Sequence, residues 1–261
     1  MLDIKGAVAV ITGAGGGIGK ALAGYWIEQG GKALLADLDG KVLDAVKAEL
    51  GGDAATIVCD VTSEEDCARM AKTAIDLFGK INLVAPCAGI IKDGMMVSPD
   101  RETGKVTKKM SLADFQKVIG INLTGVFLTA RECAEQMINN NCRGLICLIS
   151  STGSLGTAGQ INYSSSKAAV SVIPKVLTAE FFRRGFAGKI RCVAVAPGYV
   201  GTPMVKGMNQ QALEKIVEQV PIGRLIEPEE VVSLIGELYR NEALAGDVYF
   251  IHGGLRLGSK G

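Results

Sequence analysis

Short aliphatic runs alternate with longer amphipathic stretches along most of the chain. The runs are rich in β-branched residues and almost continuously apolar, which is typical of parallel strands buried on both faces. They lie at residues 7–12, 33–37, 56–60, 81–85, 145–150, 190–196 and 247–251. The pattern therefore predicts a sheet of seven strands.

The stretches between these runs carry apolar residues at helical spacing. They predict helices at 18–29, 38–50, 64–78, 111–139, 164–184 and 229–239. Thr62–Glu65 and Glu227–Glu230 add capping residues and an early proline at two helix starts. Alternating strands and helices predict an α/β fold: one Rossmann-type, doubly wound, parallel seven-stranded sheet with helices on both faces. We expect residues 1–261 to form a single domain.

One segment, residues 92–109, fits neither period. Asp100–Lys105 is expected to be an exposed turn between two short extended arms, MMVS and KVTK. The segment is either a solvated surface excursion or part of the rim of a substrate pocket.

The charge balance argues against broad electrostatic partners. Lys and Arg number 28 and Asp and Glu 27, for a formal net charge of +1. We therefore expect no nucleic-acid partner, and no membrane association either, since no apolar run is long enough to span a bilayer. The N-terminus enters a strand at once and resembles no signal peptide, so a cytoplasmic location is expected.

Cysteine and histidine usage gives no support for a metal site. The seven cysteines form no CxxC pair, and His252 is the sole histidine. Reduced thiols that pack as small hydrophobic groups are the favoured interpretation.

A glycine-rich loop follows the first predicted strand. Residues 12–19 read Thr-Gly-Ala-Gly-Gly-Gly-Ile-Gly, and a predicted helix starts there directly. Glycines let the backbone approach a pyrophosphate, and the helix start offers free N–H groups. The candidate cofactor residues in this loop are Gly13, Gly15, Gly16, Gly17, Ile18 and Gly19.

Asp37 ends the second predicted strand. A carboxylate there can accept hydrogen bonds from the adenosine ribose hydroxyls and would repel a 2′-phosphate. No arginine lies in the glycine loop or beside Asp37. NAD is therefore predicted in preference to NADP, with a helix-capping role for Asp37 as the alternative.

Tyr163 and Lys167 lie four residues apart in a predicted helix and so share one face. An ammonium near a phenol is expected to lower the pKa of the phenol and let it exchange a proton with a substrate oxygen. Ser150, at the end of a predicted buried strand, can hydrogen-bond a carbonyl oxygen, or it can simply serve the following turn. Asn122 interrupts a long helical pattern and either bends that helix or holds a water beside the lysine.

Together these residues resemble the short-chain dehydrogenase/reductase family over nearly the whole chain. The matching residues are Thr12–Gly19, Asp60-Val61, Ala88-Gly89, Asn122, Ser150, Tyr163, Lys167, and Pro197-Gly198 with Thr202. The resemblance implies that Tyr163 is the acid or base, that Lys167 lowers its pKa and binds the nicotinamide ribose, and that Ser150 orients the carbonyl. It further implies that Asn122 anchors a relay water. Asp60 and Val61 would contact adenine, and Val200 and Thr202 the carboxamide.

Two positions depart from the family pattern. Pro86-Cys87 replaces the usual Asn-Asn before Ala88-Gly89, and His252 replaces the usual Asp before a Gly-Gly pair. The segments at 121–132 and 150–170 are especially similar to the β-ketoacyl-[acyl-carrier-protein] reductase branch, whose typical members use NADPH.

The resemblance predicts an oxidoreductase that interconverts a ketone and a secondary alcohol, most simply a 3-oxoacyl and 3-hydroxyacyl thioester. Another ketone or alcohol is an alternative substrate, and a non-catalytic NAD-binding sensor or subunit is an alternative of another class. The long helices resemble those that pair subunits in the family, so a homotetramer or homodimer is expected.

Overall fold

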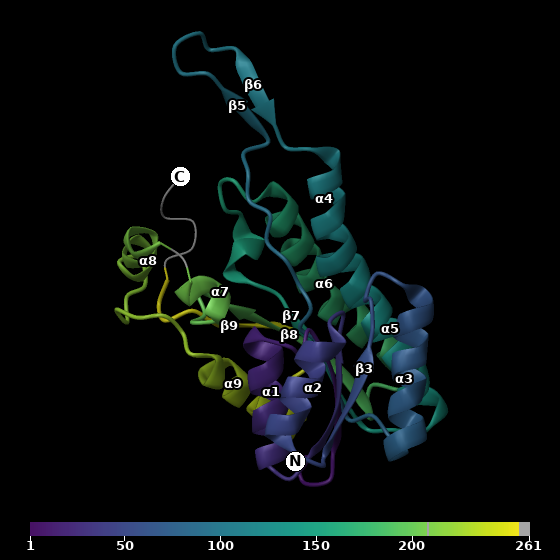
Figure 1. Cartoon of the computed structure of the whole chain (residues 1–261). Coiled ribbons are helices and arrows are strands. Elements are labelled where there is room, and N and C mark those ends of the chain that lie inside the picture. Colours follow the sequence, from purple (N-terminus) through teal and green to yellow (C-terminus); the bar gives the residue numbers. More distant parts are fainter. Residues whose placement is uncertain (208, 256–261) are drawn as a thin grey trace.

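The computed structural model describes residues 1–207 and 209–255 and is built on a seven-stranded parallel sheet (Figure 1). The strands are β1 (Val8–Thr12), β2 (Lys32–Asp37), β3 (Ala54–Val58), β4 (Leu83–Pro86), β7 (Gly144–Ile149), β8 (Ile190–Pro197) and β9 (Val248–Ile251). Each predicted strand is present within two residues of its expected ends, which confirms the predicted fold class.

Two helical layers bury the two faces of the sheet. Helices α1 (Gly17–Glu28), α2 (Gly40–Leu50) and α9 (Pro228–Arg240) cover one face, and α3 (Glu64–Phe78), α5 (Gly125–Asn139) and α6 (Ile161–Arg183) cover the other. Strand alternation divides the core accordingly: Ala9 and Ile11 of β1 join the first layer and Val10 joins the second.

The strand order is β3-β2-β1-β4-β7-β8-β9, so the chain reverses its direction of winding between β1 and β4. Open α/β sheets bind ligands at the carboxyl ends of the strands beside such a reversal. The glycine loop follows β1, and Ala88-Gly89 lies just beyond β4, so both candidate motifs lie at this point.

The helix predicted over 111–139 is divided by a π-helical turn. Helix α4 (Leu112–Ile119) leads into a π-helix at Gly120–Thr124, and α5 continues from Gly125. Asn122 lies in this turn and is completely buried. A π-turn widens the helix locally and is common at functional sites.

Residues 92–109 form a two-stranded hairpin that projects beyond the sheet edge (Figure 1). Strand β5 (Val97–Pro99) pairs antiparallel with β6 (Val106–Lys109), with a register irregularity at Ser98 and Pro99. The predicted exposed turn between two extended arms is confirmed. We call residues 95–110 the hairpin arm.

Two short helices were not predicted, α7 (Pro203–Lys206) and α8 (Gln210–Val217). They follow β8 and lie beside the same edge of the sheet as the hairpin arm (Figure 1). Both are too short to leave a clear periodic signal in the sequence.

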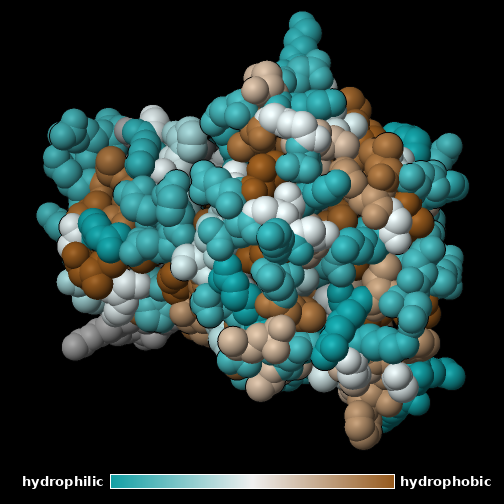
Figure 2. Space-filling view, turned by 90° about the horizontal axis from the view of Figure 1, so that it is seen from below, coloured by the Kyte–Doolittle hydropathy of each residue, from teal (hydrophilic) through white to brown (hydrophobic). Residues whose placement is uncertain are grey.

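The surface is mixed in character. Figure 2 shows a face on which hydrophilic residues predominate and hydrophobic ones form small, separated patches. Six of the seven cysteines are buried and Cys87 is half-buried, as expected for thiols that serve packing. Among the described residues, no helix has the length and apolarity needed to cross a bilayer.

Candidate active site

The glycine loop packs so tightly that side chains would collide there. A Cβ on Gly13 would lie 2.7 Å from the Ala88 backbone, and one on Gly19 would lie 2.3 Å from the Gly13 carbonyl oxygen. Gly13 and Gly17 also adopt left-handed φ values of +63° and +53°. These constraints bring the loop against the exit of β4 and leave its backbone uncovered by side chains.

The start of α1 is prepared for an anion. Its N-cap, Gly16, supplies no side-chain cap, and the first turn carries no acid. By contrast, α2, α3 and α4 are capped by the side chains of Asp39, Ser63 and Ser111. Uncapped N–H groups and the positive end of the helix dipole suit a phosphate, so the loop fits a dinucleotide pyrophosphate. Ile18 is partly buried beneath it against the core.

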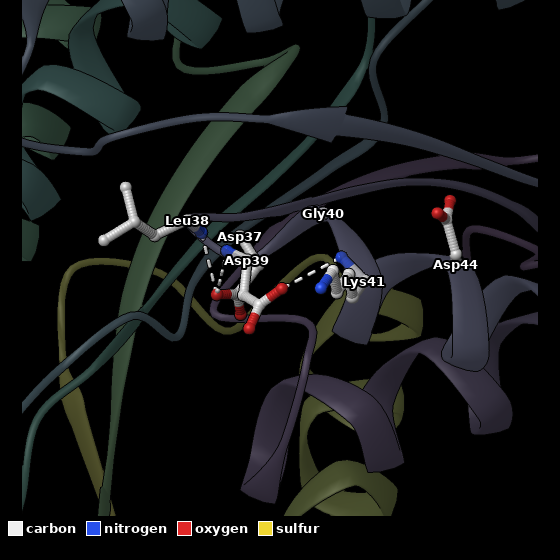
Figure 3. Close-up of a pocket in the computed structure, with 6 residues that line it drawn as sticks. All are labelled: Asp37, Leu38, Asp39, Gly40, Lys41 and Asp44. Atoms are coloured by element: carbon white, nitrogen blue, oxygen red, sulfur yellow. Dashed lines mark hydrogen bonds between the residues drawn. The ribbon is translucent and has the colours of Figure 1, made fainter.

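Asp37 is held at the end of β2 by backbone donors (Figure 3). Its Oδ2 accepts a hydrogen bond from the Gly15 N–H at 2.9 Å, and its Oδ1 accepts one from the Leu38 N–H at 2.8 Å. An open pocket beside it is lined by Asp37, Leu38, Asp39, Gly40, Lys41 and Asp44. Carboxylates outnumber cations in this lining, so the pocket disfavours an additional phosphate.

Asp60 and Val61 lie just beyond β3. Asp60 Oδ1 accepts hydrogen bonds from the N–H and hydroxyl of Thr62 at 2.9 and 2.7 Å, and its own N–H donates to Asp66. Val61 is buried against Gly125, where an added Cβ would lie 2.7 Å from the valine side chain. The Cys59 N–H donates to the Asp37 carbonyl at 2.9 Å, so this turn lies beside the end of β2.

Tyr163 and Lys167 lie one turn apart on α6 as predicted. The lysine Nζ is 5.7 Å from the centroid of the tyrosine ring and donates to the Ile149 carbonyl oxygen at 2.8 Å. Lys167 is 5% exposed, and its burial lowers its pKa to about 8. With this pKa the amine is still mostly protonated at pH 7.

The tyrosine differs from expectation. Burial raises the pKa of Tyr163, the negative charge of Asp93 raises it further, and a hydrogen bond with the Ser151 side chain opposes them. The prediction that Lys167 lowers this pKa is therefore wrong for this structure. The effect of desolvation dominates, and the Lys167 amine is engaged with the Ile149 carbonyl.

Two adjacent serines follow β7, and they point in different directions. The Ser150 hydroxyl is 3% exposed, donates to the Lys167 carbonyl oxygen at 3.0 Å and lies 2.7 Å from the Ser171 hydroxyl. Ser151 instead meets the Tyr163 side chain, and its Oγ accepts from the Gly153 N–H at 3.0 Å. The structure thus does not bring Ser150 to the phenol: strand alternation turns it under α6.

Asn122 and Gly89 meet beside the lysine. The Asn122 amide accepts from the Ile90 N–H at 2.8 Å and donates to the Ile90 carbonyl at 2.9 Å, which fixes the loop after β4. A Cβ on Gly89 would lie 3.4 Å from Asn122 Oδ1 and 3.9 Å from Lys167 Nζ. Ala88 lies against Gly13, so this loop joins the glycine loop to the catalytic helix.

The loop after β8 reaches back over the glycine loop. Pro197 ends β8, and the space beside Gly198 is filled by His252, where an added Cβ would lie 3.1 Å from the His252 Cα. Val200 is buried, and its backbone bridges to Ile226. The Thr202 methyl would lie 3.4 Å from a Cβ on Gly17. The loop from Pro197 to Thr202 therefore lies beside the glycine loop.

Residues 92–94 form a strap along the loop that precedes Tyr163. The Gly94 N–H donates to the Gly159 carbonyl at 2.7 Å, and Gln160 Nε2 donates to Asp93 Oδ2 at 3.0 Å. Asn162 Nδ2 donates to the Lys92 carbonyl at 2.9 Å. Ser151 and Asp93 were not predicted as site residues, since only the fold brings them to the loop that carries the tyrosine.

Comparison with known proteins shows the family to which the chain belongs. The family model described as short chain dehydrogenase matches residues 7–213. The chain is 32% identical to the human (3R)-3-hydroxyacyl-CoA dehydrogenase, with 97% of this chain and 96% of the relative aligned. It is 34% identical to 3-hydroxyacyl-CoA dehydrogenase type-2 of Drosophila melanogaster, with 97% and 99% aligned.

A solved structure is similar over its whole length. It is the crystal structure of 3-ketoacyl-(acyl-carrier-protein) reductase from Brucella melitensis complexed with NADH. The TM-score is 0.82 at 26% identity, with 97% of this chain and 99% of that chain covered.

The sheet topology and the glycine loop at the start of α1 are those of a dinucleotide-binding α/β protein. The chain belongs to the short-chain dehydrogenase family, and it is an oxidoreductase.

Proposed function

We propose that this protein is an NAD(H)-dependent oxidoreductase that interconverts a 3-oxoacyl thioester and its 3-hydroxyacyl form. The observation that carries the proposal is the meeting of Tyr163, Lys167 and Ser151 beside the loop at Ala88-Gly89, which packs against the glycine loop. The relatives support the substrate class, since they are named for 3-hydroxyacyl-CoA or 3-ketoacyl-carrier substrates.

In this proposal the cofactor supplies or accepts the hydride, and the protein moves the proton. The Tyr163 phenol donates its proton to the forming alkoxide during reduction and recovers one afterwards. Lys167 stabilises the phenolate electrostatically once its amine is drawn from the Ile149 carbonyl. The space by Gly89, between Asn122 Oδ1 and Lys167 Nζ, is where a water would return the proton.

We assign the carbonyl-orienting hydroxyl to Ser151 in place of Ser150. The Ser151 side chain already meets the phenol, so a carbonyl oxygen bonded to Tyr163 is also within its reach. Ser150 then acts as a positioning residue, because its hydroxyl fixes the α6 backbone at Lys167.

The cofactor preference rests on the Asp37 pocket. The ribose hydroxyls would bond to Asp37, and a 2′-phosphate would meet the carboxylates of Asp37, Asp39 and Asp44. Replacing Asp37 by Ser and Leu38 by Arg should shift the preference toward NADP by roughly tenfold or more, since each favourable charge contact contributes about 1–2 kcal/mol. Dinucleotide binding measured by NAD(P)H fluorescence checks this, and an unchanged ratio of affinities contradicts it.

The remaining cofactor contacts follow from the cleft. The pyrophosphate would lie on the N–H groups of Gly16–Gly19, with adenine against Asp60 and Val61. The nicotinamide would lie between Ala88-Gly89 and the loop from Pro197 to Thr202, within reach of the Lys167 amine. The cleft leaves its side toward Tyr163 for the substrate.

An acyl substrate is supported by the apolar border of the site. Met95, Met96 and Leu155 are more than half exposed on the segments that flank the tyrosine loop. Met95 Sδ would lie 3.9 Å from a Cβ on Gly159. Exposed apolar side chains at a cleft rim favour a hydrophobic ligand.

We also propose self-association as a homotetramer or homodimer. Large apolar side chains are exposed on the outer helices, namely Phe127 of α5 and Val172, Val176 and Phe182 of α6. A second subunit would remove them from water. The seven thiols without a disulfide suit a reducing, cytoplasmic location.

A cofactor-absorbance assay tests the proposed function. Acetoacetyl thioester should be reduced with NADH faster than with NADPH, and faster than simple ketones. Dinucleotide binding without turnover across ketones and alcohols would contradict the proposal and favour a non-catalytic binding protein.

A further inference from the structure

A carboxylate at the mouth of the site remains without an ion-pair partner. Asp93 follows Lys92 in the strap, and its side chain is exposed. Its hydrogen bond comes from the neutral amide of Gln160, the residue that caps α6 three positions before Tyr163. In the described residues no cation lies within ion-pair distance of Asp93, so its charge is uncompensated.

The cations at this edge of the sheet are committed elsewhere. Lys92 Nζ pairs with Asp114 Oδ1 at 2.6 Å, and Lys206 Nζ lies 3.3 Å from Glu227 Oε2. The buried amine of Lys167 donates to a carbonyl and has its pKa lowered to about 8. The lysines of β6 lie on the hairpin arm, which leads away from the sheet (Figure 1).

The charge of Asp93 reaches the reacting group. Gln160 holds Asp93 Oδ2 at 3.0 Å, at the start of the helix that carries Tyr163, and the Gly94 N–H fixes the strap to the Gly159 carbonyl at 2.7 Å. In keeping with this position, the charge of Asp93 adds to the larger effect of burial in raising the pKa of the Tyr163 phenol. A substrate whose carbonyl bonds to Tyr163 therefore carries its neighbouring atoms into the field of this carboxylate. In a 3-oxo acid a carboxylate lies one methylene away from the ketone, whereas in a thioester the group at that position is uncharged.

We propose that Asp93 is a specificity-determining residue that makes the site reject free 3-oxo and 3-hydroxy acids and accept their thioesters or esters. The inference rests on the proposed function and adds the chemical form of the substrate. Repulsion between two carboxylates at partly solvated separations of several ångströms corresponds to roughly a five- to tenfold change in selectivity.

Acetoacetate and methyl acetoacetate provide a matched test, because they share the ketone and differ by one charge. The measurement is the ratio of kcat/KM for the acid to that for the ester. Asp93→Asn should raise this ratio roughly five- to tenfold. Glu102→Gln, which removes the same charge from the exposed turn of the hairpin arm, should leave the ratio at the wild-type value.

Ionic strength supplies a second readout. Salt screens the charge of an exposed carboxylate. Raising the salt concentration from about 0.05 to 0.5 M should therefore raise the acid-to-ester ratio of the wild type, and it should change the ratio of Asp93→Asn much less. An Asp93→Asn ratio equal to that of the wild type overturns the inference, as does a wild-type ratio that falls with salt.

The failure of the proposed function gives a different result. If the wild type reduces neither methyl acetoacetate nor the thioester, the proposed substrate class is wrong. The role proposed for Asp93 is then tested by the binding of acetoacetate and methyl acetoacetate to the NADH-bound protein, measured by NADH fluorescence. Tighter acetoacetate binding in Asp93→Asn than in wild type supports the inference, and equal binding overturns it.

Discussion

The two halves of the sheet's carboxyl edge present chemistry in different ways. The β1–β2 half, residues 12–19 and 37–44, offers backbone N–H groups and a carboxylate held by backbone donors. The β4–β7 half, residues 87–90 and 149–167, offers buried side chains whose protonation is shifted by desolvation. The first half is shaped by glycines at positions where a side chain would collide. The second half holds Tyr163 and Lys167 in buried positions that disfavour their charged forms. Binding and proton transfer should therefore be separable by mutation.

Tyr163→Phe should give the largest effect and the sharpest separation. Loss of the proton donor is expected to lower kcat by about 10³- to 10⁴-fold, in the upper part of the usual range for general acid–base groups. NADH affinity should stay within about twofold, because the glycine half is untouched. Turnover and NADH fluorescence titration check this. Full activity in this variant would remove the tyrosine from the mechanism.

Lys167→Met should separate function from stability. Burial lowers the pKa of Lys167 from 10.5 to about 8, so the unfolded chain binds more protons between these values. Burial of the charged amine therefore lowers the free energy of unfolding of the wild type by its full amount below pH 8, and this loss disappears as the pH rises toward 10.5. At pH 7 the variant should be more stable by up to about 3 kcal/mol, less the cost of leaving the Ile149 carbonyl without its donor.

Denaturant unfolding from pH 7 to 10 measures this gap, which should narrow with rising pH. Lys175→Met, an exposed lysine on the same helix, serves as the control and should show no such trend. A gap that widens with pH would contradict the assigned cause.

The two serines after β7 divide the catalytic half itself. Ser151→Ala should lower kcat/KM by roughly 10²-fold, the usual cost of one carbonyl-stabilising donor. Ser150→Ala should lower stability by about 1 kcal/mol through its lost hydrogen bonds and reduce activity only severalfold. Steady-state kinetics and thermal unfolding on both variants decide the assignment. The reverse pattern would restore Ser150 as the carbonyl-orienting residue.

Gly19→Ala and Gly16→Ala test the glycine half with the smallest chemical change. An added methyl at Gly19 would lie 2.3 Å from the Gly13 carbonyl oxygen, whereas at Gly16 it would meet nothing within 4 Å. The first variant should lose about 1–3 kcal/mol of stability and much of its NADH affinity, as overpacked sites do. The second should keep its stability. Equal thermal midpoints would show that the loop can relax.

Much of this arrangement was predictable because a parallel α/β sheet requires a distinctive sequence pattern, in which continuous apolar runs alternate with amphipathic stretches. Continuous apolar runs gave the strands, and the cap residues near Ser63 and Pro228 gave helix starts within a residue or two. The glycine loop and the Tyr163–Lys167 spacing were likewise visible. The short helices α7 and α8 were not, since a single helical turn or two carries no period.

The errors at the site have a common physical origin. At a strand end, a shift of one residue moves a side chain to the opposite face, so the sequence alone could not decide between Ser150 and Ser151. The pKa of Tyr163 depends on burial, which spacing does not reveal. Asp93 reaches the tyrosine through Gln160, a contact between segments 67 residues apart.

The hairpin arm leaves and rejoins the fold at nearly the same place. A Cβ on Gly94 would lie 3.7 Å from the Met110 side chain, and the Met110 N–H donates to the Met96 carbonyl at 3.1 Å. The strands between them bury nothing in the two cores. This segment can therefore be replaced by another of different length or sequence, which would change the approach to the site. The two cores and the proton-transfer residues would stay as they are.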